Sequence, residues 1–243
     1  MLELLTSKLL PVPHGFPTRA GGASRGVWES LNAGSAVGDS PQAVEANLRL
    51  LATAAGVDQG RLYAVKQVHG DRVVEAPVGA AEEADALWSQ RAGDAVGILT
   101  ADCVPLLLVD PRGRRVAAVH AGWRGTLGQI ARAAIEALQK AGSRPADMHA
   151  AIGPSIRACC YQVSEDLAGQ FKQLFGPAIC QVRDGRPHLD LQAAVCSTLA
   201  HCGVPVGQID DLGLCTACDP RFFSHRRDRG ATGRHLSFVA CHF

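Results

Sequence analysis

The sequence predicts an α+β fold with mixed β-sheets flanked by helices, in one domain covering residues 1–243. Three observations favour this fold. Apolar strand-like runs and amphipathic helical runs follow one another without the steady β-α-β rhythm of a doubly wound sheet. The strongest pair of strands, 104–110 and 115–120, is joined by the turn DPRGR, so it should form an antiparallel hairpin. The length of 243 residues suits one large domain.

Before this hairpin, the sequence predicts a loop, a helix and two strands. The Gly-rich segment Thr18–Gly26 should be a loop. A helix is expected over Pro41–Ala55, because proline stands near its start, Gly56 follows its end and apolar residues recur at helical spacing. Strands are expected over Arg61–Val68 and Ala95–Thr100.

After the hairpin, helices and strands continue to alternate. Helices are expected over 126–141, 164–175 and 189–201, and strands over 148–152 and 236–240. Ser164 and Asp190 stand near helix N-cap positions, and a glycine follows each of the three helix ends. These glycines mark where each helix should stop.

The composition excludes several classes of protein. A net charge of +1 gives no basis for electrostatic capture of nucleic acid or of an anionic membrane. No run of about 18 apolar residues is present, so no membrane span is expected. The start, MLELLTSKLLPVPHGF, lacks the basic region and the cleavage site of a signal peptide, so a cytoplasmic location is expected. Nine cysteines, an odd number, favour reduced thiols in that compartment.

Three segments carry residues suited to metal chemistry. They are KQVHGD with His69, LTADCVP with Cys103 and VHAGWRGT with His120. Each ligand stands at the end of an expected strand, beside small residues that leave room for a substrate. Imidazole and thiolate suit zinc, with copper as a competitor, and three protein ligands leave a fourth position open, as in catalytic zinc sites. The three residues are too far apart in the chain to form a compact zinc-finger motif.

The same residues allow another interpretation, in which Cys103 is a nucleophile activated by His120 or His69. The sequence does not separate this from a metal site. Cys215 and Cys218 form one C-x-x-C pair, and no second pair is present, so we expect ordinary thiols there. The adjacent Cys159 and Cys160 are not expected to point at one metal.

Several arginines could bind an anion. Arg19 in TRAGG and Arg124 in GWRG combine a guanidinium with glycine-rich backbone, and both are candidates for phosphate binding. The segment SHRRDRGATGR, with arginines between Arg226 and Arg234, is expected to be a solvated or salt-bridged loop, with an anion clamp as the alternative.

These segments, in order, resemble a known family. HGFPTRAGGASRGVWESLNAGSAVGD, KQVHGDRVV, EADAL, TADCVPLLLVD, VAAVHAGWRGT, AIGPSI, CCYQV, FFSHRRD and TGRHLSFV are similar to the YfiH/YlmD-type proteins over residues 14–240. That family is described as purine nucleoside phosphorylase and, in older usage, as polyphenol oxidoreductase laccase. One departure is Gln162, which stands where the family often has the glutamate of CYEV, so no carboxylate is available there for acid–base chemistry.

The resemblance implies a zinc site at His69, Cys103 and His120, with copper as the other possible metal. It implies phosphorolysis of adenosine, inosine and S-methyl-5'-thioadenosine, and deamination of adenosine. The partners would be purine nucleosides and phosphate, without nucleic acid or membrane, and the protein would be a monomer or a homodimer. The implied fold is similar to that of cysteine-hydrolase toxins.

Two other functions stay open beside the zinc-dependent nucleoside enzyme. One is a copper-dependent, laccase-like polyphenol oxidoreductase, although nine histidines without one His-x-His pair do not suit a multicopper cluster. The other is a cysteine hydrolase or peptidoglycan-editing factor, which would use Cys103 as the nucleophile. Zinc fits deamination directly, because it lowers the pKa of a bound water to about 7. Phosphorolysis also needs a phosphate site, for which Arg19 and Arg124 are the candidates.

Overall fold

A computed structural model describes residues 2–243 and shows an α+β fold built on mixed sheets, as predicted. The larger sheet has six strands, in the order β12 (Ile209–Asp211), β9 (His149–Ile152), β7 (Val104–Asp110), β8 (Arg115–Ala121), β5 (Ala86–Ser89) and β4 (Val73–Glu75). The other has five, in the order β1 (Leu4–Leu5), β2 (His14–Pro17), β13 (His235–Ala240), β6 (Ala95–Thr100) and β3 (Leu62–Tyr63). A separate hairpin joins β10 (Cys180–Arg183) and β11 (Arg186–Leu189).

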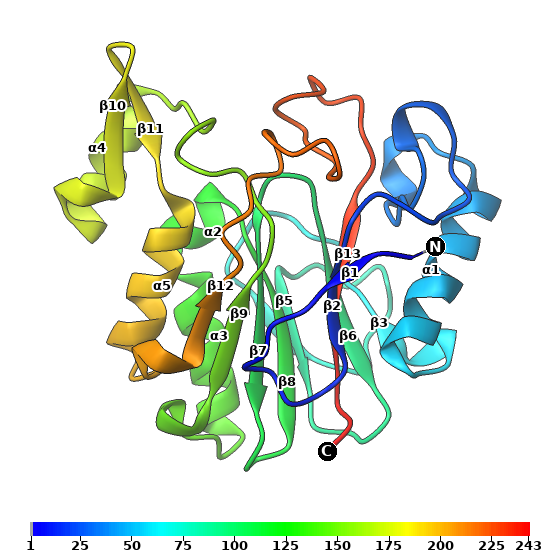
Figure 1. Ribbon diagram of the computed structural model, residues 1–243. Helices are drawn as coiled ribbons and strands as arrows, with labels where there is room; N and C mark the ends of the chain where they lie inside the picture. Colours follow the sequence, from blue (N-terminus) through cyan, green and yellow to red (C-terminus); the bar gives the residue numbers. More distant parts are fainter. Residues whose placement is uncertain (1) are drawn as a thin grey trace.

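The helices lie on the outer faces of the two sheets (Figure 1). They are α1 (Pro41–Ala55), α2 (Trp123–Leu127), α3 (Ile130–Lys140), α4 (Glu165–Phe175) and α5 (Leu191–His201). Short 3-10 turns cover Gly26–Trp28, Ser35–Val37, Gln59–Arg61, Pro145–Asp147, Pro177–Ile179 and Val206–Gln208. Helix α1 lies on one side of the molecule, and the other four helices lie on the opposite side. Within residues 2–243, no helix is both long enough and apolar enough to cross a membrane.

The alternation of side chains along β7 explains the layers. Leu106 and Leu108 point to one side and pack with residues of α3 and α5, while Leu107 points to the other side and packs with Val96 and Ile98 of β6. All seven residues of β7 are buried, as expected for a strand covered on both faces. The outer face of the five-stranded sheet packs against α1. The layers are therefore helices, six-stranded sheet, five-stranded sheet and α1.

The predicted hairpin is confirmed, with β7 and β8 antiparallel from Val104 and Ala121 to Asp110 and Arg115. Asp110 closes its turn by accepting hydrogen bonds from the backbone N–H groups of Arg112 and Gly113, at 3.1 and 2.8 Å. The two strands of this hairpin form the middle of the larger sheet. The prediction of the strongest strand pair was right because its signal is local.

Two predicted elements differ from the structure. The helix expected over 126–141 is two helices, because Gln129 adopts a left-handed conformation (φ 64°) that an α-helix cannot continue. The strand expected over 61–68 is limited to Leu62–Tyr63, where it pairs with β6. Beyond these residues, the backbone N–H groups of Val68, His69 and Gly70 donate to the side chain of Asp85 instead of to a neighbouring strand.

Candidate metal centre

The structure brings His69, Cys103 and His120 together at one end of the two sheets. His69 lies in the turn that follows β3, Cys103 ends the connection from β6 to β7, and His120 is the penultimate residue of β8. One nitrogen of each imidazole and the sulfur of Cys103 all lie within 4.8 Å of one another. The two imidazole rings meet edge to face, with centroids 4.8 Å apart. His120 is buried, Cys103 is half-buried and His69 is exposed, so the group opens to solvent on the His69 side.

Asp85, which is fully buried, orients two of these three residues. Its carboxylate accepts backbone hydrogen bonds from Val68, His69 and Gly70, at 2.7–3.1 Å, and so shapes the turn that carries His69. The same carboxylate lies 2.7 Å from Nδ1 of His120. Burial alone would raise the pKa of Asp85, but His120 and the backbone N–H groups bring it below its ordinary value. The ionised carboxylate therefore accepts a hydrogen bond from Nδ1–H, which leaves Nε2 of His120 as the ligand atom.

Asp85 was given no role by the sequence analysis. It stands in the EADAL segment, directly before an apolar strand, and other acidic residues stand beside it, so nothing local distinguishes it. Its partners His69 and His120 lie far from it in the chain, so their contacts follow from the tertiary fold alone.

Gly122 keeps open the space beside the three ligand side chains. A Cβ at this position would lie 3.2 Å from the sulfur of Cys103 and 3.2 Å from Cδ2 of His69, and 3.8 Å from Cε1 of His120. Only glycine leaves this point free. Two imidazoles and a thiolate around a free point fit a zinc ion, and also copper, because both metals take nitrogen and sulfur ligands. These three side chains can therefore hold one metal ion.

The charges of the site also suit a thiolate. Burial alone would raise the pKa of Cys103, but the imidazoles of His120 and His69 lower it to about 6. Burial alone would lower the pKa of His120, but Cys103 and Asp85 raise it to about 9. Without a metal, Cys103 and His120 therefore form a thiolate–imidazolium pair at neutral pH. Such a pair is also what a cysteine nucleophile needs.

Asp102, next to Cys103, holds three loops together. Its carboxylate accepts hydrogen bonds from Oγ1 of Thr216 and from the backbone N–H of Arg226, both at 2.6 Å. Its carbonyl accepts a hydrogen bond from the backbone N–H of Ile156 at 2.8 Å. Asp102 has a positive φ of 97°, a conformation that non-glycine residues rarely adopt and that these contacts maintain. Its carboxylate is engaged in fixing the loops, so it is a positioning group and not a free acid or base.

The two arginines predicted to bind phosphate lie on flanking segments. The guanidinium of Arg19 stacks over the ring of Phe223 at 4.8 Å and also donates to a backbone carbonyl, that of Glu29. Arg124 is exposed on α2, and its guanidinium stacks over the ring of Trp123 at 4.6 Å. Among residues 2–243, no hydrogen bond links either guanidinium to the three ligand side chains.

Arg234 is a further cationic residue near the candidate metal centre. Burial lowers its pKa, and the negative charges of Cys103 and Asp102 partly offset this effect. It donates to the carbonyls of Thr232 and Gly233, and no ion pair joins it to an acidic residue in the described part of the chain. Arg227 does follow the expectation of a salt-bridged loop, because it pairs with Asp228 at 2.8 Å. Arg234 does not.

The expectation for Cys159 and Cys160 was wrong. The sulfurs of Cys159, Cys160, Cys215 and Cys218 all lie within 4.8 Å of one another. The expectation rested only on the two residues being adjacent in the chain. Cys159 and Cys160 lie in a turn, where side chains of adjacent residues can face the same point. The C-x-x-C pair of Cys215 and Cys218 therefore does meet a second pair of cysteines.

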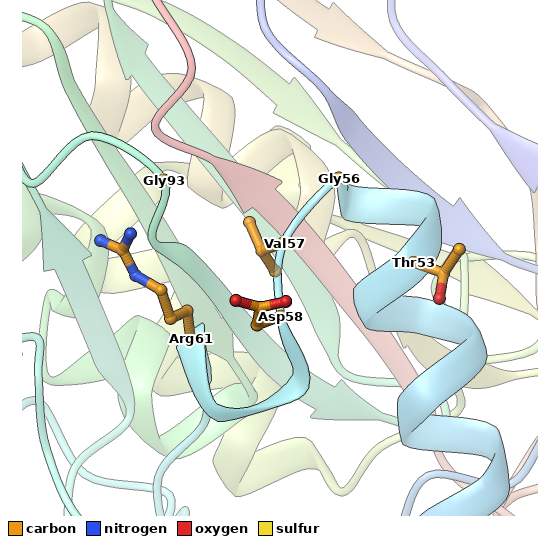
Figure 2. Close-up of a pocket in the computed structure, with 6 residues that line it drawn as sticks. All are labelled: Thr53, Gly56, Val57, Asp58, Arg61 and Gly93. Carbon is orange, nitrogen blue, oxygen red and sulfur yellow. The ribbon is translucent and has the colours of Figure 1, made fainter.

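A separate hollow of about 420 Å³ lies beside the end of α1 (Figure 2). It is lined by Thr53, Gly56, Val57, Asp58, Arg61 and Gly93. The guanidinium of Arg61 is already bound to Asp94, at 2.7 Å. The hollow adjoins the start of β6, which is about 17 Å long at 3.4 Å per residue, whereas Cys103 follows the other end of this strand. It is therefore not part of the candidate metal centre.

Comparison with known proteins shows the family. Residues 13–242 match the sequence model of a family described as multi-copper polyphenol oxidoreductase laccase. A relative from Deinococcus radiodurans, named purine nucleoside phosphorylase, is 42% identical over 239 residues, which are 98% of this chain and 92% of the relative. The chain belongs to this laccase-domain family of YfiH/YlmD-type proteins.

Solved structures agree with this assignment. The crystal structure of YlmD from Geobacillus stearothermophilus is 36% identical and aligns with a TM-score of 0.89, covering 95% of this chain and 92% of that one. The crystal structure of the hypothetical protein YfiH from Bacillus licheniformis is 35% identical and aligns with a TM-score of 0.88, covering 93% and 91%. The likeness to cysteine-hydrolase toxins stays a prediction.

Proposed function

We propose that this chain is a zinc-dependent purine nucleoside enzyme. It would cleave adenosine, inosine and S-methyl-5'-thioadenosine with phosphate, and it would deaminate adenosine with water. The observation that carries the proposal is the convergence of His69, Cys103 and His120 on a point that Gly122 leaves open. The Deinococcus and Geobacillus relatives named purine nucleoside phosphorylase support the choice of substrates. Residues 1–243 would act as one catalytic domain.

Each residue of the centre has a distinct task in this proposal. A zinc ion would supply Lewis-acid chemistry at a position open to substrate. Cys103 would bind as a thiolate, and His120 would bind as a neutral imidazole through Nε2 while Asp85 holds the proton on Nδ1. His69 would bind from the exposed side, where its backbone is held by the same carboxylate.

Phosphorolysis also requires a cationic site for phosphate beside the ribose. Arg19 and Arg124 are the candidates that the sequence suggested, and Arg234 joins them because the charges of Cys103 and Asp102 act on it and it has no acidic partner in the described residues. We expect replacement of the phosphate-binding arginine by glutamine to suppress phosphorolysis while sparing deamination, which uses water. Product chromatography of each single variant with adenosine measures both reactions in one assay. Equal loss of the two activities would assign that arginine a structural role.

The proposed activity can be tested on protein purified without added copper. After metal analysis, the protein is incubated with adenosine, inosine or S-methyl-5'-thioadenosine, with and without phosphate, and the products are separated by chromatography. We expect free purine base only when phosphate is present, inosine from adenosine without phosphate, and loss of both activities after chelation. Turnover that survives complete removal of the metal would contradict zinc dependence.

The thiolate–imidazolium pair of Cys103 and His120 favours a second candidate, a cysteine hydrolase or peptidoglycan-editing factor. Replacement of Cys103 by aspartate separates the two. As a zinc ligand, aspartate would retain weakened metal binding and some turnover of adenosine. If Cys103 is instead the nucleophile, the variant would stay inactive when the metal is restored.

The family description also names copper oxidation of polyphenols. The chain has nine histidines and no His-x-His pair, and within residues 2–243 only two histidines belong to a group that could hold a metal. One copper ion at the same centre is compatible with the donor set, but a multicopper cluster is not. Phenol oxidation that appears only after copper loading would fit occupation of the zinc site by copper.

A further inference from the structure

A second group of potential metal ligands lies on two loops that leave the larger sheet side by side. Strands β9 and β12 are parallel neighbours, so their carboxyl ends lie at the same edge. The pairing continues into the loops, where the backbone N–H of Ser155 donates to the carbonyl of Leu214 and the N–H of Thr216 donates to that of Ser155. Figure 1 shows these loops together, in light green after β9 and in orange after β12. Cys159 and Cys160 lie on the first loop, and Cys215 and Cys218 lie on the second.

The distances between the four sulfurs match what one tetrahedral ion requires. The sulfur of Cys218 lies 3.3 Å from that of Cys160 and 3.6 Å from that of Cys159, and all four lie within 4.8 Å of one another. Four thiolates at 2.3 Å from a zinc ion would be about 3.8 Å apart. Small side-chain adjustments therefore close the site. A cluster of several irons would need the sulfurs further apart, because they would bind different atoms.

The surroundings of Cys215 prepare it as a thiolate ligand. It is the buried member of the group, and the backbone N–H of Arg157 donates to its sulfur at 3.5 Å. All four cysteines are free thiols in the structure. The guanidinium of Arg157 forms an ion pair with Asp211 at 2.8 Å, so its positive charge is already paired with a carboxylate.

We propose that Cys159, Cys160, Cys215 and Cys218 bind one zinc ion as a closed, structural four-thiolate site. Unlike the candidate centre at Cys103, this site would leave no ligand position open for substrate. Binding would release the protons that the thiols carry. The proposal is independent of the nucleoside activity proposed above.

The position of the site gives it a role in the neighbouring centre. Thr216 lies between two of the four ligands and donates to Asp102, the residue before Cys103. Tyr161 follows Cys160 directly and stacks under the guanidinium of Arg226, at 5.2 Å. An ion that joins the two loops would therefore fix the wall of the candidate catalytic centre without contacting a substrate.

Metal stoichiometry of the full-length protein tests the proposal. The wild type is compared with three variants, all purified under reducing conditions: Cys159→Ser/Cys218→Ser, the control Cys180→Ser/Cys202→Ser, and Cys103→Ser. We expect the first variant to lose one zinc per chain and the control to lose none. Cys103→Ser should instead lose the zinc ion of the candidate catalytic centre. The two sites can therefore be tested independently. Cobalt substituted for zinc should show thiolate charge-transfer absorption that is much weaker in the first variant, which keeps only the single thiolate ligand of Cys103.

A labelling experiment on the wild-type protein covers the case in which the double variant does not fold. Iodoacetamide labelling, mapped by mass spectrometry, should be slow at the four cysteines and become fast after chelation. Cys180 and Cys202, which are half-buried, should label equally fast in both conditions. Unchanged labelling, absence of the second metal ion, or a disulfide linking Cys218 to Cys159 or Cys160 in reduced preparations would overturn the proposal. Iron in place of zinc would overturn the choice of metal.

Discussion

At the residue scale, one buried carboxylate acts on two segments of the candidate metal centre. Asp85 shapes the turn of His69 through three backbone N–H groups and fixes the ring of His120 through Nδ1. Residues that orient a ligand in this way usually change metal affinity strongly when they are replaced. Asp85 therefore offers a direct test of the centre that leaves the three ligands in place.

Replacement of Asp85 by asparagine should weaken zinc affinity about 10- to 100-fold, because the uncharged amide supports His120 less well. Competition with a chromophoric chelator measures this affinity. Asp110→Asn is the matched control, since Asp110 is also buried and also accepts backbone hydrogen bonds, but lies at the far end of β7. A comparable loss of affinity in the control would show that the effect comes from general destabilisation.

The thiol of Cys103 should titrate far below an ordinary cysteine in the metal-free protein. Its pKa is lowered to about 6, so the reactive thiolate forms as the pH rises through 6. The rate of alkylation by iodoacetamide should therefore have its midpoint near pH 6, whereas Cys180, whose pKa is raised by burial, should react only at higher pH. Bound zinc should protect Cys103. Equal alkylation of Cys103 with and without zinc would contradict the metal-ligand assignment.

At the element scale, the sequence predicted best those elements whose signals are local. Helices α1, α4 and α5 begin where a side chain caps them, and Ser164 and Asp190 accept backbone hydrogen bonds at 3.2 and 2.9 Å. The very short strands β1, β3 and β12 have no periodicity to detect, since tertiary pairing alone defines them. The break between α2 and α3 was missed because it depends on one left-handed residue, Gln129.

Gly122, the residue before α2, should not tolerate a side chain. Replacement by alanine places a Cβ 3.2 Å from the sulfur of Cys103 and 3.2 Å from the ring of His69, so the variant should fold but bind zinc poorly. Zinc content and a thermal melt measure the two properties. Gly169→Ala is the control: Gly169 lies exposed within α4 with open space around it, so alanine should stabilise the protein by about 0.5–1 kcal/mol and leave zinc content unchanged. Full zinc binding by Gly122→Ala would show that the metal does not occupy this point.

At the scale of the whole molecule, the candidate centre lies where the chain passes between the two sheets. Strand β6 belongs to one sheet and β7 to the other, and Cys103 ends the connection between them. The sequence could suggest His69, Cys103 and His120 as ligands from their types and neighbours. It could not indicate the role of Asp85, the proximity of Arg234 to Cys103 or the meeting of four cysteines, because these depend on contacts between segments up to about 130 residues apart.

The layered core also buries histidines that are harder to protonate in the folded state than in the unfolded chain. His235 is buried between Phe222 and Phe223, and its Nε2 accepts a hydrogen bond from the backbone N–H of Phe223 at 2.7 Å. Burial, together with the positive charges of Arg19 and other arginines, lowers its pKa to about 3. Burial also lowers the pKa of His14, whose Nε2 accepts a hydrogen bond from the backbone of Ser7. Both histidines favour the folded state only while they are neutral.

The burial of neutral His235 should make the free energy of unfolding depend on pH. Between about pH 6.5 and pH 3 the unfolded chain binds a proton at His235 and the folded chain does not, so the free energy of unfolding should fall as the pH falls, by about 1.4 kcal/mol per pH unit for one such group. Denaturant titrations of metal-free protein between pH 7 and pH 4 measure this slope.

His235→Gln isolates the contribution of this residue, because glutamine can still accept a hydrogen bond but does not titrate. Cys103 and several carboxylates also titrate in this range, so the quantity to compare is the difference in slope between the wild type and the variant. His201→Gln, at an exposed position in α5, should keep the slope of the wild type. If His235→Gln also keeps that slope, His235 must become protonated in the folded protein. The inference that His235 stays neutral in the folded protein would then be wrong.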